Sequence, residues 1–289
     1  MIFHYLKIAF RNLCKHKTQN IISIIGLAVG LLCFCVCIYC SRFVESTDHC
    51  FANHDRIAEL NLYDGKADRY FSGSPVPLAE ELRTWALGET EAISSVTYPR
   101  ERPYYVELSP EKTLPYELET IEIDTCYNKI FTPEMVAGHW KMASQSLNSV
   151  ILSQSMAIKI FGNAESAIGK HMTLMRRLNT SPESTPKTGG IVYTIQAVMK
   201  DIPLNNSLDF MQNIDMLTVN DSEGLLQSPK RHNMTGANTY VLLSPQTTCT
   251  DLEKQFSKRD YTYTLYDEAY TVTASNMGSR LKKQGASYL

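Results

Sequence analysis

The stretch of this sequence that comes nearest to a phosphate-binding loop runs from Gly162 to Lys170 and reads Gly-Asn-Ala-Glu-Ser-Ala-Ile-Gly-Lys. A P-loop places four residues between its glycines and a Ser or Thr after its lysine, because that hydroxyl binds Mg²⁺ while backbone amides cradle the phosphates. Here six residues separate Gly162 from Gly169, and His171 follows the lysine. The match therefore fails, and any nucleotide-driven work of this protein requires another chain.

Other patterns that carry chemistry are also missing from the sequence. It contains no Gly-x-Ser-x-Gly nucleophile elbow and no His-Glu-x-x-His zinc pair. The histidines and acids that lie closest together are Asp48, His49, His54 and Asp55. A metal site and a plain polar linker both stay open for this group, and the linker is the favoured interpretation. We expect no catalytic residue, no bound metal and no cofactor, so an anchored hydrolase ranks last among the hypotheses.

The cysteines do not have the distribution of a disulfide-rich secreted domain, which concentrates them in its folded part. Only Cys126 and Cys249 lie in the body of the later domain, and a bridge between them stays open. Four others lie in an apolar stretch, without the His or carboxylate that a zinc site usually adds. These are Cys33, Cys35, Cys37 and Cys40. We interpret them as small apolar residues.

The apolar stretch at residues 20–41 predicts a transmembrane helix. Its centre, Ile21–Tyr39, has nineteen residues and no charged side chain. A helix rises about 1.5 Å per residue, so this length approaches the roughly 30 Å of a hydrocarbon core. Residues 1–19 contain four basic residues and no acidic one, whereas all 30 acidic residues follow the stretch. The positive-inside rule then predicts a bacterial inner-membrane protein with a cytoplasmic N-terminus and a periplasmic main domain.

Two groups of residues in this N-terminal part are candidates for contacts with other helices or proteins. Residues 1–19 predict an amphipathic cytoplasmic helix at the membrane interface, because apolar residues recur at helical spacing between basic ones. The apolar residues are Phe3, Leu6, Phe10 and Leu13, and the basic ones are Lys7, Arg11 and Lys15. Ser23, Gly26 and Gly30 form a column of small residues, which lets two helices approach closely in lipid.

Residues 42–289 are enough for one large domain or two small ones. Strand patterns and helix patterns are interspersed along them, which predicts an α+β fold with helices on one face of each sheet. The expected strands are Arg56–Tyr63, Glu117–Ile123, Ser149–Ser153, Ile191–Met199 and Thr239–Leu243. The expected helices are Pro77–Leu87, Gln154–Phe161 and Thr250–Lys258. Leu178–Gly190, which contains two prolines and paired glycines, is typical of a loop.

Several short motifs follow one another in a definite order. Tyr5–Leu13 (YLKIAFRNL) precedes Gly26–Gly30 (GLAVG), Phe51–Leu60 (FANHDRIAEL) and Ile123-Asp124. After them come Gly138-His139-Trp140, Ser149–Gly162 (SVILSQSMAIKIFG), Ile168-Gly169-Lys170 and Tyr193–Ser207 (YTIQAVMKDIPLNNS). The series, which covers residues 1 to about 258, resembles FtsX-like ABC transporter permeases of the MacB type. Ala58, Glu59 and His139 depart from the family's usual residues.

The resemblance implies a periplasmic core domain in two parts. A porter-like subdomain would comprise residues 42–123 and 232–275, and a second α/β subdomain would be inserted at residues 124–231. Residues 276–289 would be a polar tail. In this arrangement Gly162, Gly169 and Lys170 would be turn residues of the core domain.

The resemblance also implies partners. These would be a cytoplasmic ABC ATP-binding subunit that hydrolyses ATP, a second permease in a homodimer or pair, and a periplasmic adaptor or lipoprotein. The residues implied to lie close to the ATPase are Phe3, Leu6, Lys7, Phe10 and Arg11. Ser23, Gly26 and Gly30 would lie on the packed face of the transmembrane helix.

Family members carry three more transmembrane helices after the core domain, whereas no apolar run after Tyr39 approaches eighteen residues. The sequence therefore resembles a permease without its C-terminal three-helix FtsX region. The leading hypothesis is a permease-type component that couples a cytoplasmic ATPase to a periplasmic domain acting on an exported substrate or partner. The alternative is a single-span periplasmic sensor or scaffold without transport activity. The cargo stays open, since one scaffold serves many substrates.

Overall fold

The structure is a computed structural model that describes residues 4, 5, 15, 17–71, 73–109, 112–174, 190–208, 213–222, 224–227, 235–265 and 268–279. The chain divides into two compact units, residues 1–46 and residues 47–289. We call the second unit the outer domain.

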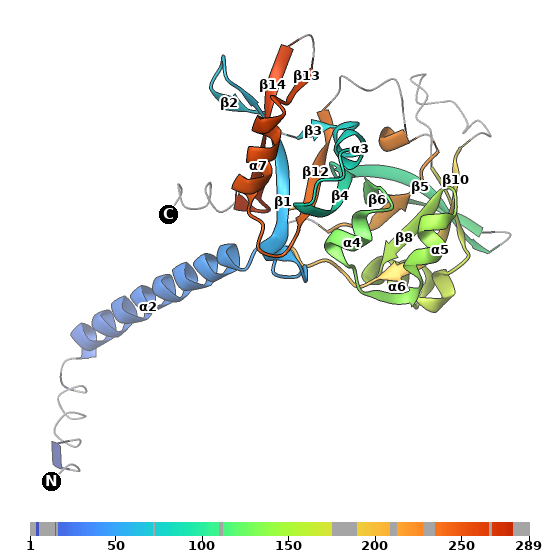
Figure 1. Ribbon diagram of the computed structural model, residues 1–289. Coiled ribbons are helices and arrows are strands. Elements are labelled where there is room, and N and C mark those ends of the chain that lie inside the picture. The colour runs from blue at the N-terminus through green and yellow to red at the C-terminus, as the bar shows by residue number, and fades with distance from the viewer. Residues whose placement is uncertain are drawn as a thin grey trace. The chain divides into compact units, whose positions relative to one another are not determined.

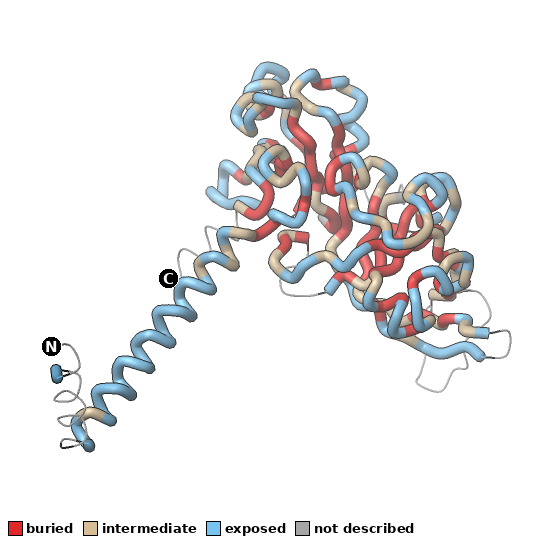
Figure 2. The backbone as a smooth tube through the Cα atoms, turned by 90° about the horizontal axis from the view of Figure 1, so that it is seen from below, coloured by how far each residue is buried: buried red, intermediate tan, exposed pale blue. Residues whose placement is uncertain are grey.

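The first unit consists mainly of one apolar helix. α2 (Lys17–Glu45) has 29 residues and a mean hydropathy of 2.9 over its most apolar window. At 1.5 Å per residue it is about 43 Å long, which exceeds a hydrocarbon core. None of its residues is buried, as Figure 2 shows. Within the described part of the chain it is the one helix that is long and apolar enough to cross a membrane. The predicted apolar helix is confirmed and is about one turn longer at each end.

Six strands of the outer domain pair in a closed ring, which we call the barrel. They are β5 (Arg100–Ser109), β6 (Lys112–Ile123), β8 (Ser149–Ser153), β9 (His171–Leu174), β10 (Val192–Met199) and β11 (Met216–Val219). β11 closes the ring, because Met216 lies opposite Thr120 of β6 on one side and Leu152 of β8 on the other. From β8 the pairing continues through β10, β9 and β5 back to β6.

The barrel strand β8 is buried on both faces, which explains why it reads as a continuous apolar run. One core cluster takes side chains from all six strands, among them Tyr104, Leu152 and Tyr193, and therefore fills the ring. α6 (Gln154–Phe161) adds apolar residues to this cluster. Ile151, between two inward residues, belongs instead to a second cluster with α4 (Tyr127–Phe131) and α5 (Trp140–Gln145).

Five further strands extend the sheet away from the barrel and form what we call the open sheet (Figure 1). In spatial order they are β4 (Thr90–Thr97), β12 (Thr235–Leu243), β1 (Ile57–Asp64), β14 (Glu268–Asn276) and β13 (Thr262–Leu265). All neighbours in this row are antiparallel, and β4 joins the barrel where Val96 lies opposite Ile123.

Two helices cover one face of the open sheet. α3 (Leu78–Arg83) and α7 (Cys249–Lys258) bury Leu82 and Phe256 in a third cluster with Leu60 of β1. The short strands β2 (Arg69–Tyr70) and β3 (Ser74–Pro75) pair with β1 and β12, and β7 (Met135–Gly138) pairs with β10 of the barrel.

The predicted α+β class is confirmed, and the elements with the strongest local patterns have the expected bounds. β8 and α6 begin and end at the predicted residues, and β1 and β10 differ from prediction by one residue. α3 ends earlier than predicted, at Arg83, and β12 begins earlier, at Thr235. Most of the predicted loop at 178–190 lies outside the described residues. The division of the outer domain at residues 124 and 231 stays a prediction, and the barrel takes strands from both sides of residue 124.

Candidate functional site

The residues predicted to lie near an ATPase are outside the part of the chain that the structure describes. They are Phe3, Leu6, Lys7, Phe10 and Arg11. The predicted packing residues Ser23, Gly26 and Gly30 lie on α2 and are exposed. A Cβ atom added to either glycine would meet no other atom within 4 Å. Cys33, Cys37 and Cys40 continue the same column at three- and four-residue spacing, and Cys37 and Cys40 have a Cys-x-x-Cys spacing.

The segment from Gly162 to Lys170 forms the turns between α6 and the barrel strand β9. Gly162 ends α6 with φ +86°, and its N–H donates to Ile158 O at 2.9 Å. Gly169 has φ +78°, and its N–H donates to Ile195 O of β10 at 2.8 Å. These backbone donors are engaged within the fold, so the segment does not cradle phosphate. Its glycines are present because these turns need a left-handed backbone.

The candidate metal and disulfide residues do not form a site in the structure. Cys126 and Cys249 are both free thiols. The rings of His49 and His54 lie 4.4 Å apart, and His54 Nε2 is 3.2 Å from Asp55 Oδ1. No group of three His, Cys, Asp or Glu side chains among the described residues is arranged to hold a metal.

Asp124, which lies in one of the family motifs, holds the open sheet to α3 and α4. Its Oδ1 accepts hydrogen bonds from Ser94 Oγ at 2.7 Å and from Cys126 N at 2.9 Å. Its Oδ2 accepts from Ser95 N at 2.9 Å and pairs with Arg83 of α3. One carboxylate therefore links α3, β4 and the start of α4.

Arg56, in another motif, has a similar role at the start of β1. Its Nε and Nη2 atoms donate to Leu243 O at 2.9 and 2.6 Å, and its guanidinium also pairs with Glu91 of β4. The end of β12 is thereby held against its two neighbours, β1 and β4. Both motif residues have structural roles in this domain.

A buried polar network ties the barrel strands together. Glu122 accepts from Arg102 Nη2 and from Leu225 N, both at 2.5 Å, and its side chain is 3% exposed. Tyr193 donates to Asp221 Oδ2 at 2.9 Å. Burial and the neighbouring Asp221 carboxylate raise the pKa of Tyr193 above its ordinary value. Every polar atom named here is used within the fold, so the network stabilises the barrel and offers no nucleophile.

A polar contact that the sequence analysis missed lies where the chain begins the outer domain. The Asp48 carboxylate binds both the N–H and the hydroxyl of Ser207, although 159 positions separate the two residues. The Asn-Asn-Ser segment that ends at Ser207 belongs to a family motif, and this motif was the one available signal. No local pattern identified its partner.

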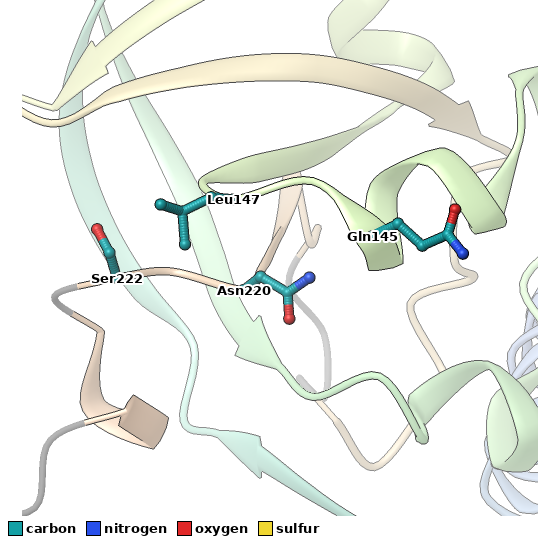
Figure 3. Close-up of a pocket in the computed structure, with 4 residues that line it drawn as sticks. All are labelled: Gln145, Leu147, Asn220 and Ser222. Atoms are coloured by element: carbon teal, nitrogen blue, oxygen red, sulfur yellow. The ribbon is translucent and has the colours of Figure 1, made fainter.

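An open pocket of about 420 Å³ lies beside the barrel and is lined by Gln145, Leu147, Asn220 and Ser222 (Figure 3). Its lining carries amide, hydroxyl and apolar groups but no charged side chain. The Ser222 hydroxyl donates to Asn148 Oδ1 at 2.9 Å, and Asn220 Nδ2 donates to Ser144 O at 2.5 Å. Since these groups bond within the protein, the pocket has no activated nucleophile or general base.

The fold is similar to that of a solved permease-protein domain, and two further solved domains match with TM-scores below 0.5. A permease-protein domain from Porphyromonas gingivalis has a TM-score of 0.56 and 20% identity, over 78% of this chain and 93% of that domain. The periplasmic region of MacB from Actinobacillus actinomycetemcomitans has a TM-score of 0.49 and 13% identity, over 82% of this chain and 94% of that region. The extracellular domain of the noncanonic ABC-type transporter YknZ from Gram-positive bacteria has a TM-score of 0.42 and 13% identity, over 76% of this chain and all of that domain.

No curated protein matches the sequence. A family model does match, and it covers most of α2 and the outer domain as far as the end of α7. The matched residues are 21–259, and the model describes the MacB-like periplasmic core domain. The chain therefore belongs to the family of proteins with a MacB-like periplasmic core domain.

Proposed function

We propose that this chain is the permease-type component of an ABC transport or mechanotransmission system. In this role it couples a cytoplasmic ATP-binding subunit to an outer domain that acts on an exported substrate or partner. The family match over residues 21–259 carries the proposal, because it includes most of the apolar helix and most of the outer domain. MacB-like permeases work with a cytoplasmic ATP-binding subunit, and ATP hydrolysis is assigned here to that subunit.

The proposal places the N-terminus in the cytoplasm and the outer domain in the periplasm. The four basic residues before the apolar stretch, without any acidic residue, support this orientation. A membrane-impermeant maleimide tests it, since Cys50 is exposed in the outer domain. In a chain that also carries Cys126→Ser and Cys249→Ser, because those free thiols lie in the same domain, spheroplasts should give labelled Cys50. A further Cys50→Ser substitution should remove the label. Labelling of Cys50 only after the membrane is opened would reverse the assignment.

Co-purification tests the coupling to an ATPase. The full chain, carrying a tag and extracted in mild detergent, should bring down an ATP-binding subunit of the ABC type. Phe10→Ala and Arg11→Ala should reduce the amount recovered several-fold, because these residues are assigned to the ATPase-proximal helix. Lys15→Ala is the matched control. If the wild-type chain recovers no ATP-binding subunit in any detergent or nanodisc, the proposal is wrong.

The same proposal assigns Ser23, Gly26 and Gly30 to a helix–helix contact in a homodimer or permease pair. Leucine at Gly26 or Gly30 would separate backbones that small residues allow to approach. Cross-linked dimers in membranes should decrease for Gly26→Leu and Gly30→Leu, whereas Ala28→Leu on the opposite face should not change them. Equal dimer yields for all three variants would exclude this face.

A further inference from the structure

The first residues after α2 are bound tightly into the outer domain. Asp48 lies three positions after the end of the helix and is 2% exposed. Its N–H donates to Asn205 O at 3.0 Å. Its Oδ1 accepts from Ser207 N at 2.6 Å, and its Oδ2 accepts from Ser207 Oγ at 2.5 Å. Hydrogen bonds to a carboxylate are about twice as strong as neutral ones. Asp48 is therefore joined to the connection between β10 and β11, which are both barrel strands.

The segment around Ser207, which binds Asp48, is itself held by hydrogen bonds of Asn206. Asn206 is fully buried, and its Nδ2 donates to Pro203 O at 2.7 Å. Its Oδ1 accepts from Leu208 N at 2.9 Å, and Leu208 packs in the core cluster beneath α4. A displacement of residue 48 is thus passed to a rigid support and not to a loose loop.

The residues that follow β14 pack against the Asp48–Ser207 contact. Gly278 has φ +71°, and a Cβ atom added there would lie 2.3 Å from Asp48 Oδ2 and 2.9 Å from Ser207 Oγ. The residue before it is fixed, because Met277 N donates to Ile57 O at 2.9 Å. Glycine is therefore required at this position both by its backbone conformation and by the closeness of the Asp48–Ser207 pair.

We propose that Asp48 is a positioning residue that carries motion of the membrane helix into the barrel. This inference rests on the proposed function. The covalent path from α2 leads through residues 49–56 to β1, which belongs to the open sheet. The Asp48–Ser207 contact adds a second path, which reaches the barrel directly between β10 and β11. Both parts of the outer domain then respond together to one displacement.

Hydrogen exchange tests the second path in the full chain, held in lipid nanodiscs with its co-purified ATP-binding subunit. The probe is ATP with vanadate, compared with no nucleotide. In the wild type we expect nucleotide-dependent exchange changes both in β1 and in residues 203–208 with β11. Asp48→Ala should keep the change in β1 and lose the change in 203–208 and β11. Gly278→Ala should give the same loss with no substitution at Asp48 or Ser207, because the added Cβ atom displaces the Asp48 carboxylate.

Two variants separate this role from a general loss of stability. Asp48→Asn should behave like the wild type, because its oxygen can accept from Ser207 N and its amide can donate to Ser207 Oγ. Residue 48 has φ +70°, a backbone conformation that Asn tolerates. Asp64→Ala is the matched control. It removes a carboxylate at the far end of β1 that accepts from Lys66 N at 3.0 Å and Ala67 N at 3.2 Å. This variant should keep the nucleotide-dependent exchange changes both in β1 and in residues 203–208 with β11.

The outcomes distinguish the two proposals. If Asp48→Ala responds like the wild type in 203–208 and β11, the positioning role is overturned while the permease function stands. The same holds if Asp64→Ala loses those changes as fully as Asp48→Ala does. If the wild type shows no nucleotide-dependent change in either region, both proposals are overturned. Should Asp48→Ala not fold, Gly278→Ala and Ser207→Ala, which removes only the hydroxyl donor, decide the question.

Discussion

The barrel and the open sheet share one continuous network of strands, but their edges differ. In the barrel, β11 pairs with both β6 and β8, so the ring closes on itself. In the open sheet, β13 pairs with β14 alone among the described strands. A closed ring resists separation of any one strand, because each strand is bonded on two sides. An open sheet can lose or gain a strand at its edge. The comparison indicates that the barrel is the more rigid part and that the open sheet can change more easily at its edge.

The barrel strand β8 and the edge strand β13 differ in burial. All five residues of β8 are buried, because the strand is covered on both faces. β13 alternates instead, with Thr262 and Thr264 exposed and Tyr263 and Leu265 buried. One face of the open sheet is covered by α3 and α7, so its edge strand needs apolar residues only on that face.

The largest effect should come from proline in a barrel strand. Thr194 N of β10 donates to Asn148 O at 3.0 Å. Thr194→Pro removes this donor and forces the strand backbone toward an unsuitable φ, so we expect a loss of about 3–5 kcal/mol in the free energy of unfolding. Thr264→Pro in β13 should cost about 1 kcal/mol or less, because proline is tolerated at an edge. Urea unfolding of both variants measures the difference. An equal loss of unfolding free energy in the two variants would contradict the distinction between the closed barrel and the open sheet.

The next effect separates a buried ion pair of the barrel from an exposed pair of the open sheet. Glu122→Ala leaves Arg102 and Leu225 N without their acceptor. Because the Arg102 side chain is 22% exposed, we expect about 2–3 kcal/mol, less than for a fully buried pair. Glu91 pairs with Arg56, and the Glu91 side chain is 42% exposed. Glu91→Ala should therefore lower the free energy of unfolding by less than about 1 kcal/mol. Chemical denaturation of the two variants gives the comparison. A larger loss for Glu91→Ala would refute it.

Removing a helix cap should cost more stability in the open sheet than in the barrel, and this difference should be smaller than the two above. Thr248 begins α7 with a capping box, in which Asp251 N donates to Thr248 Oγ1 at 3.3 Å and Thr248 N donates to Asp251 Oδ2 at 3.2 Å. Ser153 begins α6 with one long contact, from Met156 N at 3.4 Å. We expect about 1 kcal/mol for Thr248→Ala and about 0.5 kcal/mol for Ser153→Ala. Thermal unfolding checks the order of the two.

The smallest effect concerns pH, and two aspartates should act with opposite sign. Burial raises the pKa of Asp215, beside the barrel, above 3.8, so its stabilising contribution is present at low pH and is lost as pH rises through the raised pKa. Hydrogen bonds from Lys254 and Thr248 lower the pKa of Asp251, on α7, from 3.8 to about 2. The contribution of Asp251 is therefore present above 3.8 and is lost as pH falls toward 2.

Asparagine variants test these signs. The stability of Asp215→Asn relative to the wild type should increase as pH rises from the acid range toward neutral, because only the wild type loses the contribution of Asp215. Asp251→Asn should lose the part of the acid sensitivity that falls between pH 3.8 and about 2. Melting temperatures across this range measure both. A shift of the two variants in the same direction would contradict the assignment.

Elements with a strong local pattern could be predicted from the sequence. β8 and α6 follow one another as a short apolar run and a helix that ends at a glycine, and both have the predicted bounds. The strands β5 and β13 are among those that were missed. Pro103 and exposed glutamates weaken the local signal of β5, and β13 is short, with only four residues that alternate as in a strand. Both strands are held by pairing with their neighbours, in which Tyr104 lies opposite Tyr116 and Tyr263 lies opposite Tyr270.

The candidate site shows the same limit. The motif residues Arg56, Asp124 and Ser207 could be selected from the sequence, but their partners could not. Leu243 binds Arg56 across 187 positions, and Asp124 pairs with Arg83 across 41 positions. Hydrogen bonds at such separations have no periodicity along the chain, so no local pattern identifies them.

By itself, the sequence determined that an apolar helix without charges precedes an α+β domain, since a hydrocarbon core and a buried strand select residue types directly. It also determined the family, through motifs in a definite order. Only the tertiary structure decided that six strands close into a barrel, and that Asp48, Ser207 and Gly278 meet at the start of the outer domain. Closure and long-range contacts depend on how distant segments pack together, and that packing has no signature within any one segment.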